Sequence, residues 1–310
     1  MAIIEVENLT KKFGNVLAVD NISFSIPEGE VFGFLGPNGA GKTTTIRILS
    51  TLISPTSGRV LIYNAEPKTN GRYIRSIIGL LTETPGLYEK ISAYDNLYFF
   101  SSFYDISNEK RRQNIEKFMK MFGLWDRRND IVATYSKGMK QKLALARALI
   151  HEPKILFLDE PTAGLDPESA YMVRNFIEDL KKESTTIILC THNLQEASTL
   201  CDRVCILKTR IVKIATLEEL QKGKDTKEVE IVFANNPLRF RSLLNSIEEV
   251  INQKVEDNKI KLLLKNTNTE KTNPKIIRKL IEEGAEIVYF NEVKTNLEEI
   301  YLSLIGNLES

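Results

Sequence analysis

The chain has 310 residues, of which 42% are hydrophobic and 27% charged, and its net charge is +1. This composition is typical of a globular protein with one large or two modest domains, and the near-neutral charge argues against bulk electrostatic binding to nucleic acid or lipid head groups. The sequence has no run of about 18 apolar residues that would span a membrane, and residues 1–5 lack a secretory-signal pattern. We therefore expect a cytoplasmic protein with reduced thiols at positions 190, 201 and 205.

The first part of the chain contains a glycine-rich loop between a predicted strand and a predicted helix. Strands at 3–7 and 16–26 come first, the apolar run 31–35 predicts a buried strand directly before the loop, and a helix is predicted at 43–52. The loop consists of Gly36, Pro37, Asn38, Gly39, Ala40, Gly41, Lys42, Thr43 and Thr44. A strand, a loop of this pattern and a helix are the setting of a phosphate-binding loop, or Walker A motif.

This loop has the chemistry to bind the phosphates of ATP. Glycines let backbone N–H groups turn toward an anion without a Cβ in the way, and the start of the following helix adds further N–H donors. Lys42 supplies a mobile positive charge for the β- and γ-phosphates, and the Thr43 hydroxyl suits a Mg²⁺ ion. A chance glycine-rich turn is the alternative, but it would not explain why all four fixed positions and both flanks match.

Strands and helices then alternate up to about residue 221. The stretch 92–127 is a helical insertion rich in aromatic residues, and Ser136 is the predicted cap of a helix at about 137–151. Residues 155–158 form a continuous apolar run, which is typical of a central parallel strand. The other predicted strands are 59–63, 77–81, 185–190, 203–207 and 210–215, and the other predicted helices are 168–182 and 193–200. The alternation indicates an α/β domain around a mainly parallel sheet.

The pattern changes near residue 222, where a polar linker begins. Beyond it we predict strands at 228–233, 259–264 and 286–290 and helices at 237–247, 274–283 and 296–305. The chain is therefore expected to have two domains. The first is an ATP-binding domain at 1–221 with a helical subdomain at about 88–150, and the second is a small α+β domain at 222–310 without a catalytic motif.

The strand at 155–158 ends in two carboxylates, Asp159 and Glu160. At this distance after a Walker A loop, such an ending indicates a Walker B motif, in which Asp159 would hold Mg²⁺ directly or through water. Glu160 lies one residue further on and would polarise the attacking water as a general base. Cys201, Cys205 and His192 are an alternative metal-binding group, but their spacing fits no usual zinc pattern and favours packing.

Residues 2–218 resemble the ATP-binding subunits of ABC transporters. The segment Tyr135-Ser136-Lys137-Gly138-Met139-Lys140-Gln141 is similar to the signature motif of that family, whose usual core is Leu-Ser-Gly-Gly-Gln. The form Ser-x-Gly-Met-x-Gln is common in the branch of prokaryotic multidrug and antibiotic exporters that have a separate permease. The resemblance implies an α/β P-loop fold with a mainly parallel core sheet, an antiparallel β subdomain and a helical subdomain, followed here by the α+β domain.

The resemblance also implies functional roles for residues that their type and position alone would not identify. Phe13 occupies the position of an aromatic residue that stacks on adenine, although alone it would be read as core. Glu83 stands where Gln is usual, in a loop that senses Mg²⁺ and contacts the permease. Asp166 belongs to the D-loop, which couples the two sites of a dimer. His192 matches the switch histidine, which contacts the γ-phosphate and steadies the water beside Glu160.

The resemblance therefore predicts an ATPase that powers a membrane transporter. Two copies, most simply a homodimer, would enclose two ATP molecules, with Ser136 and Gly138 of one copy facing the phosphates held by the other. A separate permease would dock on the aromatic insertion and place the chain on the inner face of the membrane. There are two alternatives. One is a translation or DNA-repair factor of the same superfamily, but such a protein would usually carry two cassettes or long coiled-coil insertions. The other is an inactive nucleotide-binding regulator, but the presence of both Glu160 and His192 argues against it.

Overall fold

The chain folds into two compact units. The computed structural model describes residues 2–222, 226–265, 269–293 and 297–306. Contacts divide the chain into Met1–Thr216 and Leu217–Ser310. This division lies close to the expected domain boundary at 221/222, which itself stays a prediction. None of the helices within the described ranges is long and apolar enough to cross a membrane.

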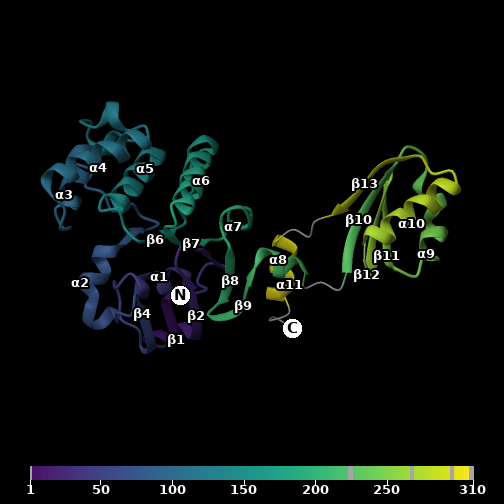
Figure 1. Cartoon of the computed structure of the whole chain (residues 1–310), viewed down its shortest axis with the longest axis horizontal. Coiled ribbons are helices and arrows are strands. Elements are labelled where there is room, and N and C mark those ends of the chain that lie inside the picture. Colours follow the sequence, from purple (N-terminus) through teal and green to yellow (C-terminus); the bar gives the residue numbers. More distant parts are fainter. Residues whose placement is uncertain (1, 223–225, 266–268, 294–296, 307–310) are drawn as a thin grey trace. The chain divides into compact units, whose positions relative to one another are not determined.

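The first unit contains two sheets (Figure 1). The six-stranded sheet has the order β5-β6-β7-β3-β8-β9, in which every neighbouring pair is parallel except β8 and β9. Its strands are β3 (Val31–Leu35), β5 (Ile78–Leu81), β6 (Ile155–Asp159), β7 (Thr186–Thr191), β8 (Arg203–Lys208) and β9 (Arg210–Thr216). The second sheet is antiparallel, with β1 (Ala2–Phe13) between β2 (Val16–Pro27) and β4 (Ser57–Ile62). The predicted mainly parallel core sheet and antiparallel β subdomain are confirmed.

One apolar core joins the two sheets through helix α1 (Lys42–Leu49). Ile46, Ile48 and Leu49 of this helix are buried in the same cluster as side chains from both sheets. Phe32 and Phe34 of β3 pack in that core against Phe24 of β2, with ring centroids 5.3 to 5.8 Å apart. Strands β3, β6 and β7 are buried at every position, which explains the apolar runs that they contain.

The remaining helices of this unit are α2 (Pro67–Ile77), α3 (Ala93–Ser101), α4 (Asn108–Met121), α5 (Lys137–Leu149), α6 (Pro167–Lys182) and α7 (Leu194–Leu200). Helices α3, α4 and α5 contact one another and form a group of their own beside α6 (Figure 1). Helix α2 was not predicted. It buries only Ile74, so its sequence lacks the apolar stripe that identifies a helix.

The second unit has a four-stranded antiparallel sheet in the order β11-β12-β10-β13. Its elements are α8 (Leu217–Lys222), β10 (Thr226–Phe233), α9 (Arg241–Asn245), β11 (Val250–Glu256), β12 (Lys259–Lys265), α10 (Thr269–Glu282), β13 (Ile287–Val293) and α11 (Leu297–Gly306). The run from β10 to β13 is the β-α-β-β-α-β arrangement of ferredoxin-like folds. Strand β11 was not predicted, because it is an edge strand with no buried residue.

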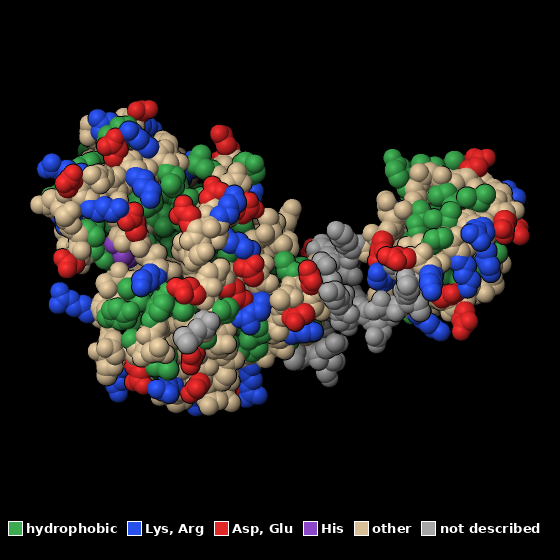
Figure 2. Space-filling model, viewed as in Figure 1, with side chains coloured by type: hydrophobic (Ala, Val, Ile, Leu, Met, Phe, Trp, Pro, Cys, Tyr) green, Lys and Arg blue, Asp and Glu red, His purple; other side chains and the backbone are tan. Residues whose placement is uncertain are grey.

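Charged side chains are mixed over the surface. Figure 2 shows Lys and Arg interspersed with Asp and Glu on the visible face.

The three cysteines are buried and free, and burial raises the pKa of each thiol, that of Cys205 to about 12. Cys201 packs against Gly33, where a Cβ would lie 2.6 Å from the sulfur.

His151 connects the helical group to the parallel sheet. Its ring stacks on Tyr104 with the centroids 3.6 Å apart, and its Nε2 lies 2.9 Å from the carbonyl oxygen of Ile78. Burial lowers the pKa of His151 to about 4, although the contact with Ile78 acts in the opposite direction. The ring is therefore neutral at physiological pH.

We predict that the free energy of unfolding decreases as the pH falls from about 6.5 to about 4, because the unfolded chain protonates His151 and the folded chain excludes that proton. The full effect is about 3 kcal/mol, measurable by urea denaturation at a series of pH values. His151→Phe keeps the ring contact and should lose this part of the pH dependence. An unchanged pH profile in that variant would contradict the assignment.

Candidate nucleotide site

The glycine-rich loop runs from the end of β3 to the start of α1 and is held from two sides. Gly39 and Gly41 have left-handed backbone angles, with φ of 81° and 99°. A Cβ at Gly41 would lie 2.5 Å from the carbonyl oxygen of Ala18 in β2, so only glycine fits there. On the other side, the N–H of Thr209 donates to the carbonyl of Ala40 over 2.9 Å.

Lys42 and Thr43 are the first two residues of α1, and their side chains point toward the glycine-rich loop and β6, the strand of the predicted Walker B motif. The Lys42 ammonium is buried and donates to the carbonyl oxygens of Gly36 and Pro37, at 2.6 and 3.1 Å. The Thr43 hydroxyl donates to Oδ1 of Asp159 over 3.3 Å. Two of the three predicted metal-site residues, Thr43 and Asp159, therefore meet from distant parts of the sequence, and the third, Glu83, lines the same cavity.

Asp159 lies at the end of β6 and is 3% exposed. Burial raises the pKa of this carboxyl, and the charges of Glu160 and Glu83 raise it further, whereas the bond from Thr43 and the charge of Lys42 lower it. Asp159 therefore feels the negative charges of two other carboxylates as well as one ammonium. A divalent cation would offset that negative charge, and hydroxyl and carboxylate oxygens are donors that Mg²⁺ accepts.

The protein does not provide a complete metal cage by itself. The described part of the chain has no group of three or more His, Cys, Asp or Glu side chains arranged around one metal position. Mg²⁺ usually takes one or two carboxylates from a protein and fills its other positions with phosphate oxygens and water. Thr43 and Asp159 fit that partial role, while Glu83 contributes charge from the loop after β5.

Glu160 and His192 form a pair at the ends of adjacent strands. The Glu160 backbone is left-handed, with φ of 52°, and its N–H donates to the carbonyl of Cys190. Its Oε1 accepts from the backbone N–H of His192 at 3.0 Å and lies 2.8 Å from His192 Nδ1. The carboxylate is 15% exposed and the imidazole 65% exposed. A fixed carboxylate with an open imidazole beside it suits activation of a water molecule.

These groups line one cavity of about 430 Å³. The predicted residues that line it are Phe13, Asn38, Gly39, Ala40, Gly41, Lys42, Thr43, Thr44, Glu83, Asp159, Glu160 and His192. Val16, Leu17, Ala18 and Ala163 also line it and were not predicted. Val16 and Leu17 are exposed apolar residues that follow closely after Phe13, which is itself 49% exposed. Their place just after Phe13 is the only sequence feature that could have identified them as site residues.

Ser136, Gly138 and Asp166 do not line this cavity but lie together elsewhere. Ser136 begins α5, where its hydroxyl accepts from the N–H of Met139 at 3.2 Å. Asp166 begins α6, where its Oδ1 accepts from the N–H of Ser169 at 2.9 Å. A Cβ at Gly138 would be 3.1 Å from the Ser169 hydroxyl, so the two helix starts are packed closely. The structure thus brings the predicted residues together in two groups.

Glu196 is a buried acid near this site that sequence reasoning missed. It is 2% exposed, and its Oε1 accepts from the hydroxyl of Thr162, two residues beyond Glu160. Its Oε2 has no hydrogen-bond partner in the described structure. Burial raises the pKa of the Glu196 carboxyl, and the charge of Glu160 adds to this.

The raised pKa of Glu196 means that its protonated form stabilises the fold, and that this stabilisation is lost as the pH rises from about 4.5 through the folded-state pKa. Glu196→Gln keeps an acceptor for Thr162 and removes the charge. We predict a melting temperature about 2–4 °C higher than wild type at pH 7, with a smaller difference near pH 4. Glu7→Gln, at an exposed position on β1, is the control; equal melting temperatures for wild type and Glu196→Gln at both pH values would refute the prediction.

A buried Lys and Thr on a glycine-rich loop, facing a carboxylate at the end of a parallel strand, define a P-loop ATPase site. The family described as ABC transporter matches residues 19–163. The ABC transporter ATP-binding protein YhcH of Bacillus subtilis, itself described as uncharacterized, is 35% identical over 98% of this chain and 96% of its own length. The bacitracin transport ATP-binding protein BcrA of Enterococcus faecalis is 32% identical over 98% of this chain and 96% of its own length.

A solved structure agrees with these relatives. The dimeric ATP-binding cassette MJ0796, in a post-hydrolysis state with ADP and phosphate, has a TM-score of 0.64 at 28% identity and covers 69% of this chain and 98% of its own. The chain therefore belongs to the ATP-binding proteins of ABC transporters. The expected fold and the expected activity, ATP hydrolysis by a transport ATPase, are confirmed, and the translation or DNA-repair alternative finds no support.

Proposed function

We propose that this chain is the ATP-hydrolysing subunit of an exporter, and that it works as a homodimer on a separate membrane permease. The division of the predicted site residues into two groups carries this proposal. The cavity holds the groups that grip phosphate and activate water, whereas Ser136 and Gly138 lie outside it at an exposed helix start. A second copy would bring that helix start to the phosphates, and the dimeric state of MJ0796 supports such an arrangement.

The proposed chemistry follows from the positions of five side chains. Lys42 would bind the β- and γ-phosphates after leaving the Gly36 and Pro37 carbonyls. Thr43 and Asp159 would hold Mg²⁺, which would offset phosphate charge. Glu160 would take a proton from the attacking water, with His192 holding the Glu160 carboxylate in place through two contacts. The helix start at Ser136 of the second copy would add N–H donors to the γ-phosphate.

The proposed cargo class rests on the relatives and on the form of the signature segment. BcrA of Enterococcus faecalis is named for transport of bacitracin, and it matches almost the whole of this chain, including the second unit. The signature segment 135–141 also has the form common among antibiotic exporters. An antibiotic-like compound is therefore our proposed cargo, and the inner face of the cell membrane is the proposed location.

Glu160→Gln tests the proposed mechanism. The amide keeps the contact with the His192 N–H but cannot accept the proton, so we predict a fall in kcat of at least about 100-fold with ATP affinity unchanged. The variant should also dimerise when ATP is added, as measured by light scattering. Lys42→Ala is the control, since it should lose ATP binding itself. Hydrolysis at the wild-type rate by Glu160→Gln would disprove the general-base role.

An aromatic patch at the helical group is the proposed permease-docking surface. Tyr88, Phe99 and Phe103 are 52%, 40% and 69% exposed, and their rings contact one another edge to face at 5.1 to 5.2 Å. Arg147, near the end of α5, packs 4.8 Å from the Phe100 ring and donates to the Gly86 carbonyl at 2.7 Å. Helix α5 thereby connects the patch, and the loop that follows Glu83, to Ser136 at its other end.

We predict that Phe103→Ser reduces the amount of the chain recovered with the cell membrane fraction by about tenfold, because the permease loses its apolar contact. The ATPase rate of the purified variant should equal that of wild type. Tyr171→Ser changes a comparably exposed aromatic residue on α6 and should have no effect on either measurement. Equal membrane recovery for both variants would place the permease contact elsewhere.

A further inference from the structure

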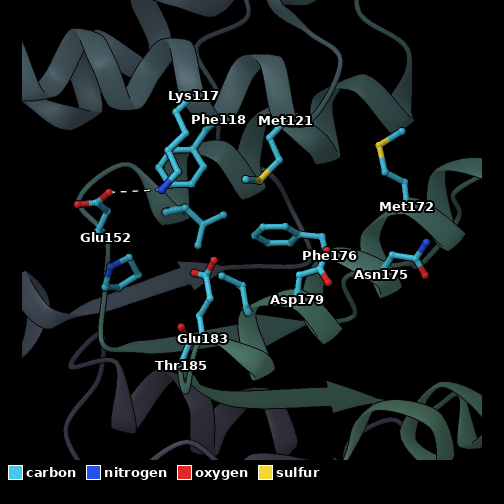
Figure 3. A pocket seen from close by; sticks show the side chains of 13 residues that line it. Lys117, Phe118, Met121, Glu152, Met172, Asn175, Phe176, Asp179, Glu183 and Thr185 are labelled. Atoms are coloured by element: carbon cyan, nitrogen blue, oxygen red, sulfur yellow. Dashed lines mark ion pairs between the residues drawn. The ribbon is translucent and has the colours of Figure 1, made fainter.

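A second cavity, of about 470 Å³, lies between α4 and α6 and shares no residue with the nucleotide cavity. Phe118 and Met121 of α4 face Met172 and Phe176 of α6 across it (Figure 3). Figure 2 shows hydrophobic side chains between the helical group and α6, with acidic side chains beside them. The mechanism proposed above uses none of these residues.

The walls of this cavity suit a flat apolar group. Phe118 and Phe176 are 4% and 8% exposed, so their rings are fixed by the core, whereas Met121 is 46% exposed. Methionine adapts its shape to a bound group and makes favourable contacts with aromatic rings. A cavity of a few hundred Å³ with apolar walls and a few polar groups is typical of small-molecule sites.

The polar groups at this cavity are mainly acidic. Glu152 is neutralised by Lys110 at 2.9 Å and Lys117 at 3.5 Å. In the part of the chain that the structure describes, Asp179 pairs with Lys182 alone, in an ion pair whose two side chains are 67% and 74% exposed. Glu183 has neither an ion pair nor a side-chain hydrogen bond among the residues that the structure describes.

The position of Glu183 strengthens the negative potential. It is the C-cap of α6, where the free carbonyls of the helix already favour positive charge. The two lysines of the last turn do not offset it, because Lys181 pairs with Asp202 at 2.5 Å and Lys182 with Asp179. Unpaired negative charge and an apolar cavity therefore meet at the end of this helix.

We propose that this cavity binds a small organic cation with an aromatic body. The aromatic body lies against Met121 and Met172 in the cavity that Phe118 and Phe176 help to line, and the cationic group lies at Glu183 and Asp179. Such a ligand would bridge α4 of the helical group and α6, whose first residues pack against Gly138. Because the two cavities share no residue, the cation binds together with ATP and does not compete with it.

The test uses the full chain and three naphthalene probes of matched size, measured by calorimetry with and without ATP. 1-Naphthylmethylamine is the cation, 1-naphthalenemethanol the neutral analogue and 1-naphthoate the anion. We expect the amine to bind at least about tenfold more tightly than the alcohol, and the naphthoate to bind more weakly still. We also expect saturating ATP to leave the affinity of the amine unchanged.

Glu183→Gln should weaken binding of the amine about tenfold and leave binding of the alcohol unchanged, because the variant loses charge but no packing. Glu168→Gln, an exposed acid at the other end of α6, is the matched control and should bind the amine like wild type. Equal affinities for the three probes, displacement of the amine by ATP, an unaffected Glu183→Gln variant, or no binding at about 1 mM would each overturn the proposal. If none of the probes binds, the cavity would instead suit a larger partner such as a protein segment.

Discussion

The contacts that hold the glycine-rich loop in place are the constraint on which the rest of the first unit depends. A loop that presents its N–H groups to phosphate has few side chains with which to fix itself, so its neighbours must hold it. Here the antiparallel sheet meets it at Gly41 through Ala18, and the parallel sheet meets it at Ala40 through Thr209. Helix α1 anchors the loop to the core that both sheets share. Displacement of either sheet would move the Lys42 ammonium.

The two groups of site residues differ in how they are supported. The phosphate-facing group lies at the ends of β3, β6 and β7, strands that are buried throughout and fix its geometry. The group at Ser136 and Asp166 sits at two helix starts that contact each other and are open to solvent. Helix α5 carries Ser136 at one end and Arg147 near the other, so a single helix joins the aromatic patch to that helix start.

Most of the first unit could be predicted because its sequence patterns have direct physical causes. The apolar runs at β6 and β7 reflect burial on both faces, and the glycines of the loop reflect backbone angles and close contacts. The failures have physical causes too. Helix α2 buries a single side chain and β11 buries none, so neither has a periodic apolar face. Val16 and Glu196 were missed because their roles depend on neighbours that only folding brings close. The assignments of catalytic and metal-binding roles stay predictions.

The burial of Cys190, Cys201 and Cys205 has a practical consequence. A thiol reacts as its thiolate, and burial holds each of these thiols in the neutral form away from solvent. Maleimide dyes should therefore not label any of the three cysteines in the native protein. A cysteine introduced at an exposed position, such as Lys137 on the signature helix or Asn38 on the phosphate loop, would be labelled selectively without first removing the natural ones. Fluorescence energy transfer between two copies labelled in this way would then test whether the proposed dimer forms and closes when ATP is added.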